Sequence, residues 1–263
     1  KAGIKPGDTV IAINGEDMTG IDGSLVLRRI LGPAGTNVTL TIRREGQDPF
    51  DVTITRAKIV VPSVILEMRE DGIAYIQLTT FGDKTTTELR DALREMNQKN
   101  ARGLILDVRY NGGGYLDTAI EVTSEFIKAN EVVMYEDFGD GTRKVYRAYR
   151  GGLATDIPLV ILVNEGTASA SEILSGAIQD YERGLIVGTT TYGKGSVQNW
   201  APLVNDQGAI RVTIARWLTP KERQIHGQGI TPDIEVVITE EDYANDKDPQ
   251  LDKAVEAINT LVK

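Results

Sequence analysis

Three short, continuous apolar segments, each followed at once by a loop of small residues, constrain the fold of this chain most strongly. The segments cover residues 103–108, 159–163 and 185–187. Apolar runs of this length are typical of strands that are covered on both faces in a parallel sheet. Function in such folds usually lies on the loops that follow the strands. We therefore expect an α/β core that carries its site on these three loops.

Helical and extended patterns alternate through the same part of the chain. An apolar period of 3.6 residues from Leu89 to Met96 predicts a helix over 86–97. The turn signal Asp71-Gly72 predicts that the strands on either side of it pair with one another. The remaining patterns predict strands at 60–68, 73–78, 209–218 and 234–238, and helices at 116–127, 170–179 and 248–262.

The first 57 residues form a separate strand–helix–strand pattern. Strands are expected at 9–13, 37–44 and 51–56, and a helix is expected at 24–31. Asn14-Gly15 is a strong hairpin signal after the first of these strands. We expect three parts, namely a small module at 1–57, a linker with a return strand at 58–72, and a larger core at 73–263 that ends in a helix.

Composition excludes several classes of function. The net charge of −9 at pH 7 disfavours a nucleic-acid partner. The absence of cysteine excludes thiol catalysis, and with a single histidine and no clustered carboxylates we expect neither a metal site nor a cofactor. No apolar run approaches the roughly 18–20 residues of a membrane span, so no membrane anchor is visible.

The loop at 164–172, Asn-Glu-Gly-Thr-Ala-Ser-Ala-Ser-Glu, can be interpreted in two ways. Its small residues would leave Ser169 accessible at a helix start, where the following amide could form half of an oxyanion hole. Ser169 and Glu172 also match a capping box, so Ser169 could simply cap the helix. Gly166 lies one residue too early for the usual nucleophile elbow.

The loop at 107–114, Asp-Val-Arg-Tyr-Asn-Gly-Gly-Gly, exposes backbone amides near a helix start. It could therefore bind a ligand, or it could be a flexible turn. Asp107 and Arg109 point the same way from a strand and could pair with one another. Both interpretations remain open from the sequence.

The loop at 188–195 nearly matches a phosphate-binding loop. Gly195 stands where that loop needs Ser or Thr, and an extended pattern follows instead of a helix. Lys194 could be a solvated hairpin lysine, or it could be a general base if burial keeps it neutral. Gln198 is placed to orient its amine. A Ser-His-Asp triad would have to use His226, the single histidine, which lies in a polar loop.

Five segments in order resemble the carboxyl-terminal processing peptidases, also called tail-specific proteases, which form serine protease family S41. The resemblance covers essentially the whole chain. The segments are Asp107-Val-Arg-Tyr-Asn-Gly-Gly-Gly114, Thr167-Ala-Ser-Ala-Ser-Glu-Ile173, Tyr192-Gly-Lys-Gly-Ser-Val-Gln198, Ala215-Arg-Trp-Leu-Thr-Pro220 and Gly229-Ile-Thr-Pro-Asp233.

The resemblance implies a crotonase/ClpP-like core of strand and helix layers and a Ser–Lys dyad. In it, Ser169 is the nucleophile, Lys194 the general base and Gln198 the residue that orients the lysine. The oxyanion donors would be the amide of Ala170 and an amide of either Gly113 or Gly114. Position 112 is glycine here, where many relatives carry proline.

The N-terminal module resembles a PDZ domain in the segments Ala2-Gly-Ile-Lys-Pro-Gly-Asp8 and Ile11-Ala-Ile-Asn-Gly15. The first strand and the carboxylate-binding loop are not seen, so we expect an N-terminally truncated α+β module with an incomplete groove. The resemblance implies that this module captures substrate and gates the protease.

The resemblance also implies polypeptide substrates with accessible carboxyl termini and a location outside the cytoplasm, in the periplasm or at the cell surface. It allows for an activating or adaptor protein and for a homo-oligomer. The expected function is a serine endopeptidase that cleaves proteins near their carboxyl terminus. The alternative is a catalytically resting peptide-binding protein that carries a PDZ domain.

Overall fold

The computed structural model describes residues 2–5, 7–58, 62–204 and 208–262. The chain separates into two compact units, Lys1–Val61 and Pro62–Lys263. The return strand expected within 58–72 is β5 (Val64–Met68), which pairs inside the second unit. Residues 60 and 61, where that strand was expected to begin, lie outside the described residues.

Unit 1 is a small antiparallel sheet with one helix. Strand order is β2-β1-β3-β4, and alternate residues of β3 at Val38, Leu40 and Ile42 are buried. This alternation produces a one-sided core. The elements are β1 (Thr9–Ile13), β2 (Glu16–Asp17), α1 (Gly23–Ile30), β3 (Asn37–Arg43) and β4 (Phe50–Thr55).

Unit 2 is built on a six-stranded sheet of order β14-β11-β10-β7-β6-β5. All neighbours run parallel except β5 and β6, which form the hairpin expected around Asp71-Gly72. The other strands of this sheet, in chain order, are β6 (Ile73–Leu78), β7 (Gly103–Asp107), β10 (Leu159–Val163), β11 (Leu185–Gly188) and β14 (Ile234–Glu235). The expected α/β core is therefore confirmed.

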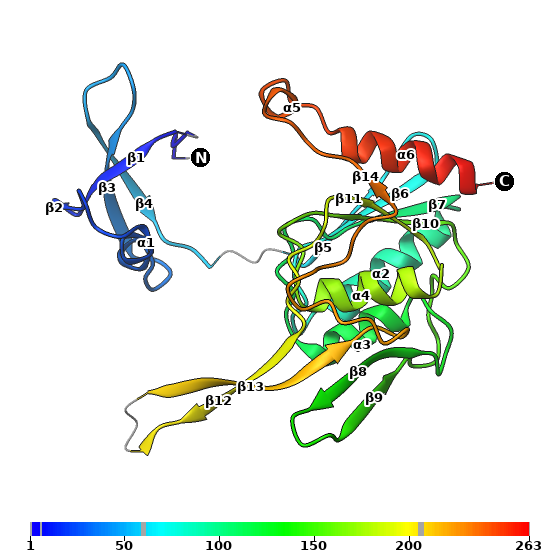
Figure 1. Cartoon of the computed structure of the whole chain (residues 1–263). Coiled ribbons are helices and arrows are strands. Elements are labelled where there is room, and N and C mark those ends of the chain that lie inside the picture. Colours follow the sequence, from blue (N-terminus) through cyan, green and yellow to red (C-terminus); the bar gives the residue numbers. More distant parts are fainter. Residues whose placement is uncertain (1, 6, 59–61, 205–207, 263) are drawn as a thin grey trace. The chain divides into compact units, whose positions relative to one another are not determined.

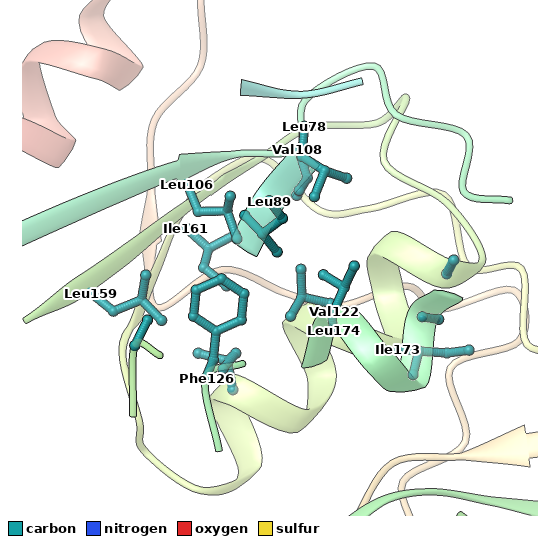
Figure 2. Packing of buried hydrophobic residues seen from close by; sticks show 14 of the residues in the cluster. Leu78, Leu89, Leu106, Val108, Val122, Phe126, Leu159, Ile161, Ile173 and Leu174 are labelled. Atoms are coloured by element: carbon teal, nitrogen blue, oxygen red, sulfur yellow. The ribbon is translucent and has the colours of Figure 1, made fainter. Parts of the chain in front are cut away.

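Helices cover both faces of this sheet (Figure 1). Leu104 and Leu106 of β7 pack in the cluster formed with α2 (Thr85–Gln98), α3 (Leu116–Ser124) and α4 (Ala170–Asp180). Ile105, between them, packs in the cluster formed with α6 (Pro249–Leu261). Figure 2 shows sheet residues such as Leu106 and Ile161 facing helix residues such as Leu174. Burial on both faces explains the continuous apolar character of β7 and β10.

A second sheet in unit 2 has the order β12-β13-β8-β9 and is antiparallel throughout. The hairpin of β8 (Val132–Phe138) and β9 (Arg143–Arg147) was not predicted. Strand β8 does begin with an apolar run, Val132-Val-Met-Tyr135, but three of the five residues of β9 are charged. The other pair is β12 (Ser196–Pro202) and β13 (Ala209–Leu218), which extends from the body of the unit (Figure 1).

Two predicted elements end three residues earlier than expected. The helix α3 ends at Ser124 instead of 127, and β14 ends at Glu235 instead of 238. A short helix, α5 (Glu240–Ala244), precedes α6 and was also not predicted. Within the described ranges, no helix is both long enough and apolar enough to cross a bilayer.

Candidate active site

The three loops singled out from the sequence lie at one edge of the sheet. They follow β7, β10 and β11, which are mutually parallel neighbours. The carboxyl ends of parallel strands meet at the same edge, so the topology brings residues 108–115, 164–169 and 189–195 together. The sequence order of strands and loops therefore already determined where the site would form.

Ser169 is the N-cap residue of α4 and has a strained backbone. Its φ of 57° and ψ of −116° lie in a region that residues other than glycine rarely adopt. Such strain is typical of a serine on a sharp strand-to-helix turn. The spacing to Gly166 still differs from that of the nucleophile elbow, and the strain lies at Ser169 itself, between β10 and α4. Ser169 is half-buried and also takes part in a capping box with Glu172, as its sequence allowed.

The side chain of Glu172 joins the serine loop to the lysine loop. It is fully buried, and its Oε2 atom accepts the amides of Ser169 at 2.8 Å and of Lys194 at 2.9 Å. Its Oε1 atom accepts the hydroxyl of Thr191 and the amide of Gly193, each at 2.6 Å. Four donors thus satisfy one buried carboxyl group, as a buried charged or polar group requires.

Lys194 is positioned by its backbone on both sides. Its amide donates to Glu172, and its carbonyl accepts the indole Nε1 of Trp217 at 2.9 Å. Strand β12 begins two residues later, and its pairing with β13 shifts register between Val197 and Gln198. Such a bulge re-aims side chains beside a site. In this protein the bulge directly precedes Gln198.

The glycine loop is held against the serine loop by Asn111. The buried side chain of Asn111 donates to the Leu78 carbonyl at 2.6 Å and accepts the Gly113 amide at 2.9 Å. The Asn111 carbonyl accepts the amide of Ala168 at 3.0 Å. These bonds bring the amides of this loop next to the start of α4.

Two glycines of this loop have no room for a side chain. A Cβ on Gly113, whose φ is +97°, would lie 2.8 Å from both the Ala168 carbonyl oxygen and the Ala170 nitrogen. A Cβ on Gly114 would collide with the Phe81 carbonyl. Gly112, in contrast, has open space around it. The loop therefore needs glycine at 113 and 114 for close approach of backbones.

One cavity of about 240 Å³, which we call cavity A, collects the predicted residues. Its polar lining comprises Gly114, Ser169, Ala170, Lys194, Ser196 and Gln198. Its apolar lining comprises Leu116, Met134, Ile173, Val197 and Trp217. Gly113 contacts the same region through its backbone but does not line cavity A. A polar wall that faces an apolar one is a common form of ligand site.

Asp107 and Arg109 form a structural network. Arg109 donates to Asp107 at 2.7 Å and to Asp248, the N-cap of α6, at 2.8 Å. Asp107 also accepts the Tyr75 hydroxyl at 2.7 Å. Burial acts to raise the pKa of Asp248, but the hydrogen bond and charge of Arg109 and the hydrogen bonds from the backbone of α6 together outweigh it and hold this pKa below its usual value. Asp107 and Arg109 thus pair with one another, as one interpretation of the sequence allowed, and the bond from Arg109 to Asp248 fastens α6 to the sheet.

The other sequence alternatives find little support. Residue 195 is followed by strand β12 and not by a helix, so the lysine loop lacks the helix start of a phosphate-binding loop. His226 is exposed, and within the described residues no hydrogen bond links it to an Asp or Glu side chain. Among those same residues, no group of three or more His, Cys, Asp or Glu residues is arranged to hold a metal ion.

Comparison with known proteins identifies the family. The model of peptidase family S41 matches residues 72–236, which is more than half of the chain. The chain belongs to peptidase family S41. Its N-terminal unit carries a PDZ domain match over residues 1–44.

Relatives within family S41 cover most of this chain. It is 38% identical over 252 residues to the carboxy-terminal processing protease CtpA of Bacillus subtilis strain 168, covering 96% of this chain and 53% of that protein. It is 41% identical over 241 residues to a carboxy-terminal-processing protease of Bartonella bacilliformis, covering 90% of this chain and 55% of the relative. The chain thus spans about half the length of the curated relatives it matches.

Solved structures agree with the S41 fold. The photosystem II D1 C-terminal processing protease superposes with a TM-score of 0.64 at 30% identity, over 89% of this chain and 64% of that one. A putative S41 protease from Bacteroides fragilis superposes with a TM-score of 0.66 at 17% identity, over 100% of this chain and 73% of that one. The fold class expected from the resemblance is therefore confirmed.

Sequence reasoning missed the residues that hold this S41 site together. Glu172 was seen only as part of a capping box, and the roles of Asn111 and Trp217 were not predicted. One signal was present for Glu172. It is the one ionisable residue in the small and apolar segment 166–178, and such a residue in a buried helix start needs partners.

Proposed function

We propose that this chain carries the catalytic unit of a serine endopeptidase that cleaves polypeptides near their carboxyl terminus with a Ser169–Lys194 dyad. The observation that carries the proposal is that Ser169, Ala170, Gly114, Lys194 and Gln198 all line cavity A. These residues come from the three loops, from the start of α4 and from strand β12. Their meeting at one cavity supports a chemical role for the set.

The proposed reaction begins with the neutral amine of Lys194, which takes the proton of the Ser169 hydroxyl. The serine oxygen then bonds to the carbonyl carbon of the scissile peptide. As the tetrahedral intermediate collapses, the C–N bond breaks and Lys194 returns the proton to the leaving amine. Water next attacks the acyl-enzyme, and this step releases the acid product and restores the Ser169 hydroxyl. Gln198 orients the lysine amine.

The oxyanion would accept hydrogen bonds from the amides of Ala170 and Gly114. Gly113, the other residue considered, donates its amide to Asn111 at 2.9 Å. In the described part of the chain, no acceptor is bonded to the amide of Gly114 or of Ala170. Both residues line cavity A. Losing one such donor typically lowers the rate by about 100- to 1000-fold.

The apolar wall of cavity A supports a substrate preference on the acyl side. Leu116, Met134 and Ile173 lie on that wall. A cavity of about 240 Å³ that it shares with the catalytic groups accommodates a small or medium apolar side chain. We therefore expect such a residue directly before the scissile bond.

The remaining parts of the proposal rest on the family. The PDZ unit would capture substrate tails and gate the protease, as PDZ domains bind carboxyl-terminal peptides by strand addition. Location outside the cytoplasm, an activating or adaptor partner and a homo-oligomer belong to the same proposal. The division at 1–57, 58–72 and 73–263 is retained as the proposed domain plan.

Hydrolysis of casein, an unstructured protein, tests the proposal. The parent should cleave it, and Ser169→Ala and Lys194→Ala should each lower the rate by at least about 1000-fold. Ser175→Ala is the matched control on the same helix, because its hydroxyl donates to the Ser171 carbonyl and does not line cavity A. Full activity in Ser169→Ala or in Lys194→Ala would contradict the dyad. No cleavage by the parent would favour the peptide-binding alternative.

A further inference from the structure

A second cavity lies beside cavity A, and the reaction described above does not use all of it. This cavity, which we call cavity B, has a volume of about 490 Å³. Its side-chain lining comprises Tyr192, Lys194, Ser196, Gln198 and His226, together with small residues of the three loops. Lys194, Ser196 and Gln198 line both cavities.

The position of cavity B relative to the dyad indicates which part of a substrate it would receive. It contacts Lys194 but neither Ser169 nor the amides of Ala170 and Gly114. In acyl transfer, the acyl part stays bonded to the serine and points its oxygen at those amides. The leaving amine departs on the side of the base that protonates it. A cavity that reaches the base and not the serine is therefore on the leaving side.

The lining of cavity B is not acidic, unlike the protein as a whole. The chain carries a net charge of −9, yet no Asp or Glu side chain lines this cavity among the residues that the structure describes. The nearby carboxyl group of Glu172 is fully buried and already accepts four hydrogen bonds. The lining instead offers an imidazole, a phenol, a hydroxyl and an amine, all of which can donate a hydrogen bond.

We propose that cavity B binds the polypeptide segment after the scissile bond and that His226 selects a carboxylate on that segment. The carboxylate is either an acidic side chain or the terminal carboxyl group of a short leaving fragment. His226 is exposed in its loop, and Tyr192, whose exposed fraction is 69%, lines the same cavity. This inference rests on the proposed function, because it assigns a leaving side to the same dyad.

Matched peptides that differ only after the scissile bond test the inference. One series carries Glu or Lys at the second position of the leaving segment with an amidated end. The other series carries the same neutral leaving segment with a free or an amidated end. The parent should favour the Glu peptide in kcat/KM by about two- to fivefold, the size of an exposed charge interaction. If the peptide with the free end is preferred over the amidated one by a similar factor, the terminal carboxylate is a second group that cavity B recognises.

Charge reversal at His226 provides the sharper measurement. His226→Glu should invert the Glu-to-Lys preference, and His226→Gln should remove most of it. Gln228→Glu is the matched control, because it adds the same charge to the same loop outside cavity B and should retain the parent preference. A para-nitroanilide substrate with no leaving segment should be hydrolysed equally by the parent and both His226 variants. An unchanged Glu-to-Lys ratio in His226→Glu would overturn the inference.

Binding separates this inference from the peptidase proposal. Fluorescence anisotropy of a labelled leaving fragment on Ser169→Ala protein measures cavity B without any reaction. His226→Glu in that background should weaken binding of the Glu fragment and strengthen binding of the Lys fragment. If the Glu and Lys fragments bind equally well to the protein with His226, and equally well to the His226→Glu protein, the proposed site is rejected. If the parent hydrolyses no peptide but this binding pattern is observed, only the peptidase proposal is rejected.

Discussion

Glu172 accepts the backbone amide of Lys194 at 2.9 Å, so the residue three positions after Ser169 fixes the loop that carries the lysine. The same oxygen atom accepts the amide of Ser169 at 2.8 Å. One carboxyl oxygen thus sets the spacing between the backbones of the two proposed catalytic residues. Because Glu172 is fully buried, water cannot substitute for it.

We expect Glu172→Gln to impair both stability and activity. The amide retains one acceptor oxygen, but its NH2 group would face donors that the second carboxyl oxygen satisfied. Unfolding free energy should fall by about 2–4 kcal/mol, the cost of leaving buried groups unpaired. The turnover number kcat should fall more than KM rises, since the dyad would be displaced.

Urea unfolding and peptide kinetics measure the two effects of this change. Glu165→Gln is the matched control, because Glu165 is exposed and lies in the same loop region. It should change stability by less than about 0.5 kcal/mol. Parent-like stability and kcat in Glu172→Gln would show that the carboxyl bridge does not position the dyad.

Alanine should lower stability at only one of two adjacent glycines. Gly113→Ala would place a methyl group 2.8 Å from the Ala170 nitrogen at a φ of +97°. We expect a loss of about 2–5 kcal/mol from strain and overpacking, and loss of hydrolysis as the Ala170 amide shifts. Gly112→Ala meets no atom within 4 Å and should be neutral or stabilise by up to about 1 kcal/mol.

Thermal or urea unfolding of both glycine variants provides the comparison. The pair has the same chemistry in neighbouring positions, so each is a control for the other. Equal destabilisation of the two variants would mean that the close approach of the glycine and serine loops is not a constraint on the fold.

Shortening a side chain on the apolar wall of cavity A should change which substrates are preferred. Leu116 is half-buried and lines this wall, so Leu116→Ala would enlarge the cavity. We expect kcat/KM for a peptide with Phe before the scissile bond to rise at least about tenfold relative to one with Ala. Ile65→Ala, on β5 and outside cavity A, should leave this ratio unchanged. The same ratio in both variants would place the acyl-side subsite elsewhere.

Acid should weaken the attachment of α6 through Asp248. The pKa of Asp248 is lowered in the folded state, so its carboxylate binds Arg109 and stabilises the fold at neutral pH. This contribution is present above the unfolded pKa of about 3.9 and is lost as pH falls through the lower folded value. Asp248→Asn should therefore lose less stability than the parent between pH 5 and pH 3.

Urea unfolding at several pH values measures this slope. Asp246→Asn, two residues earlier, is the matched control, because the structure shows no bond between Asp246 and Arg109. The stability of Asp246→Asn should change with pH as that of the parent does. A parent-like slope in Asp248→Asn would show that the ion pair contributes nothing to acid sensitivity.

The sequence by itself determined the α/β core and the edge at which the site forms. The apolar runs of β7, β10 and β11 are local signals, and parallel strands must end together. The five ordered motifs also determined the family and indicated Ser169, Lys194 and Gln198. The sequence could reveal these features because the burial of a strand and the composition of the loop after it are both visible in consecutive residues.

Only the tertiary structure decided how the loops are joined. Glu172 contacts Thr191, Gly193 and Lys194, which are 19 to 22 residues away. The bond from Asn111 to the Leu78 carbonyl, and that from Arg109 to Asp248, likewise depend on distance in space. Hydrogen bonds between remote segments leave no period in the sequence, so the strain at Ser169, the choice of Gly114 and cavity B appear only once the sheet has brought its loops together.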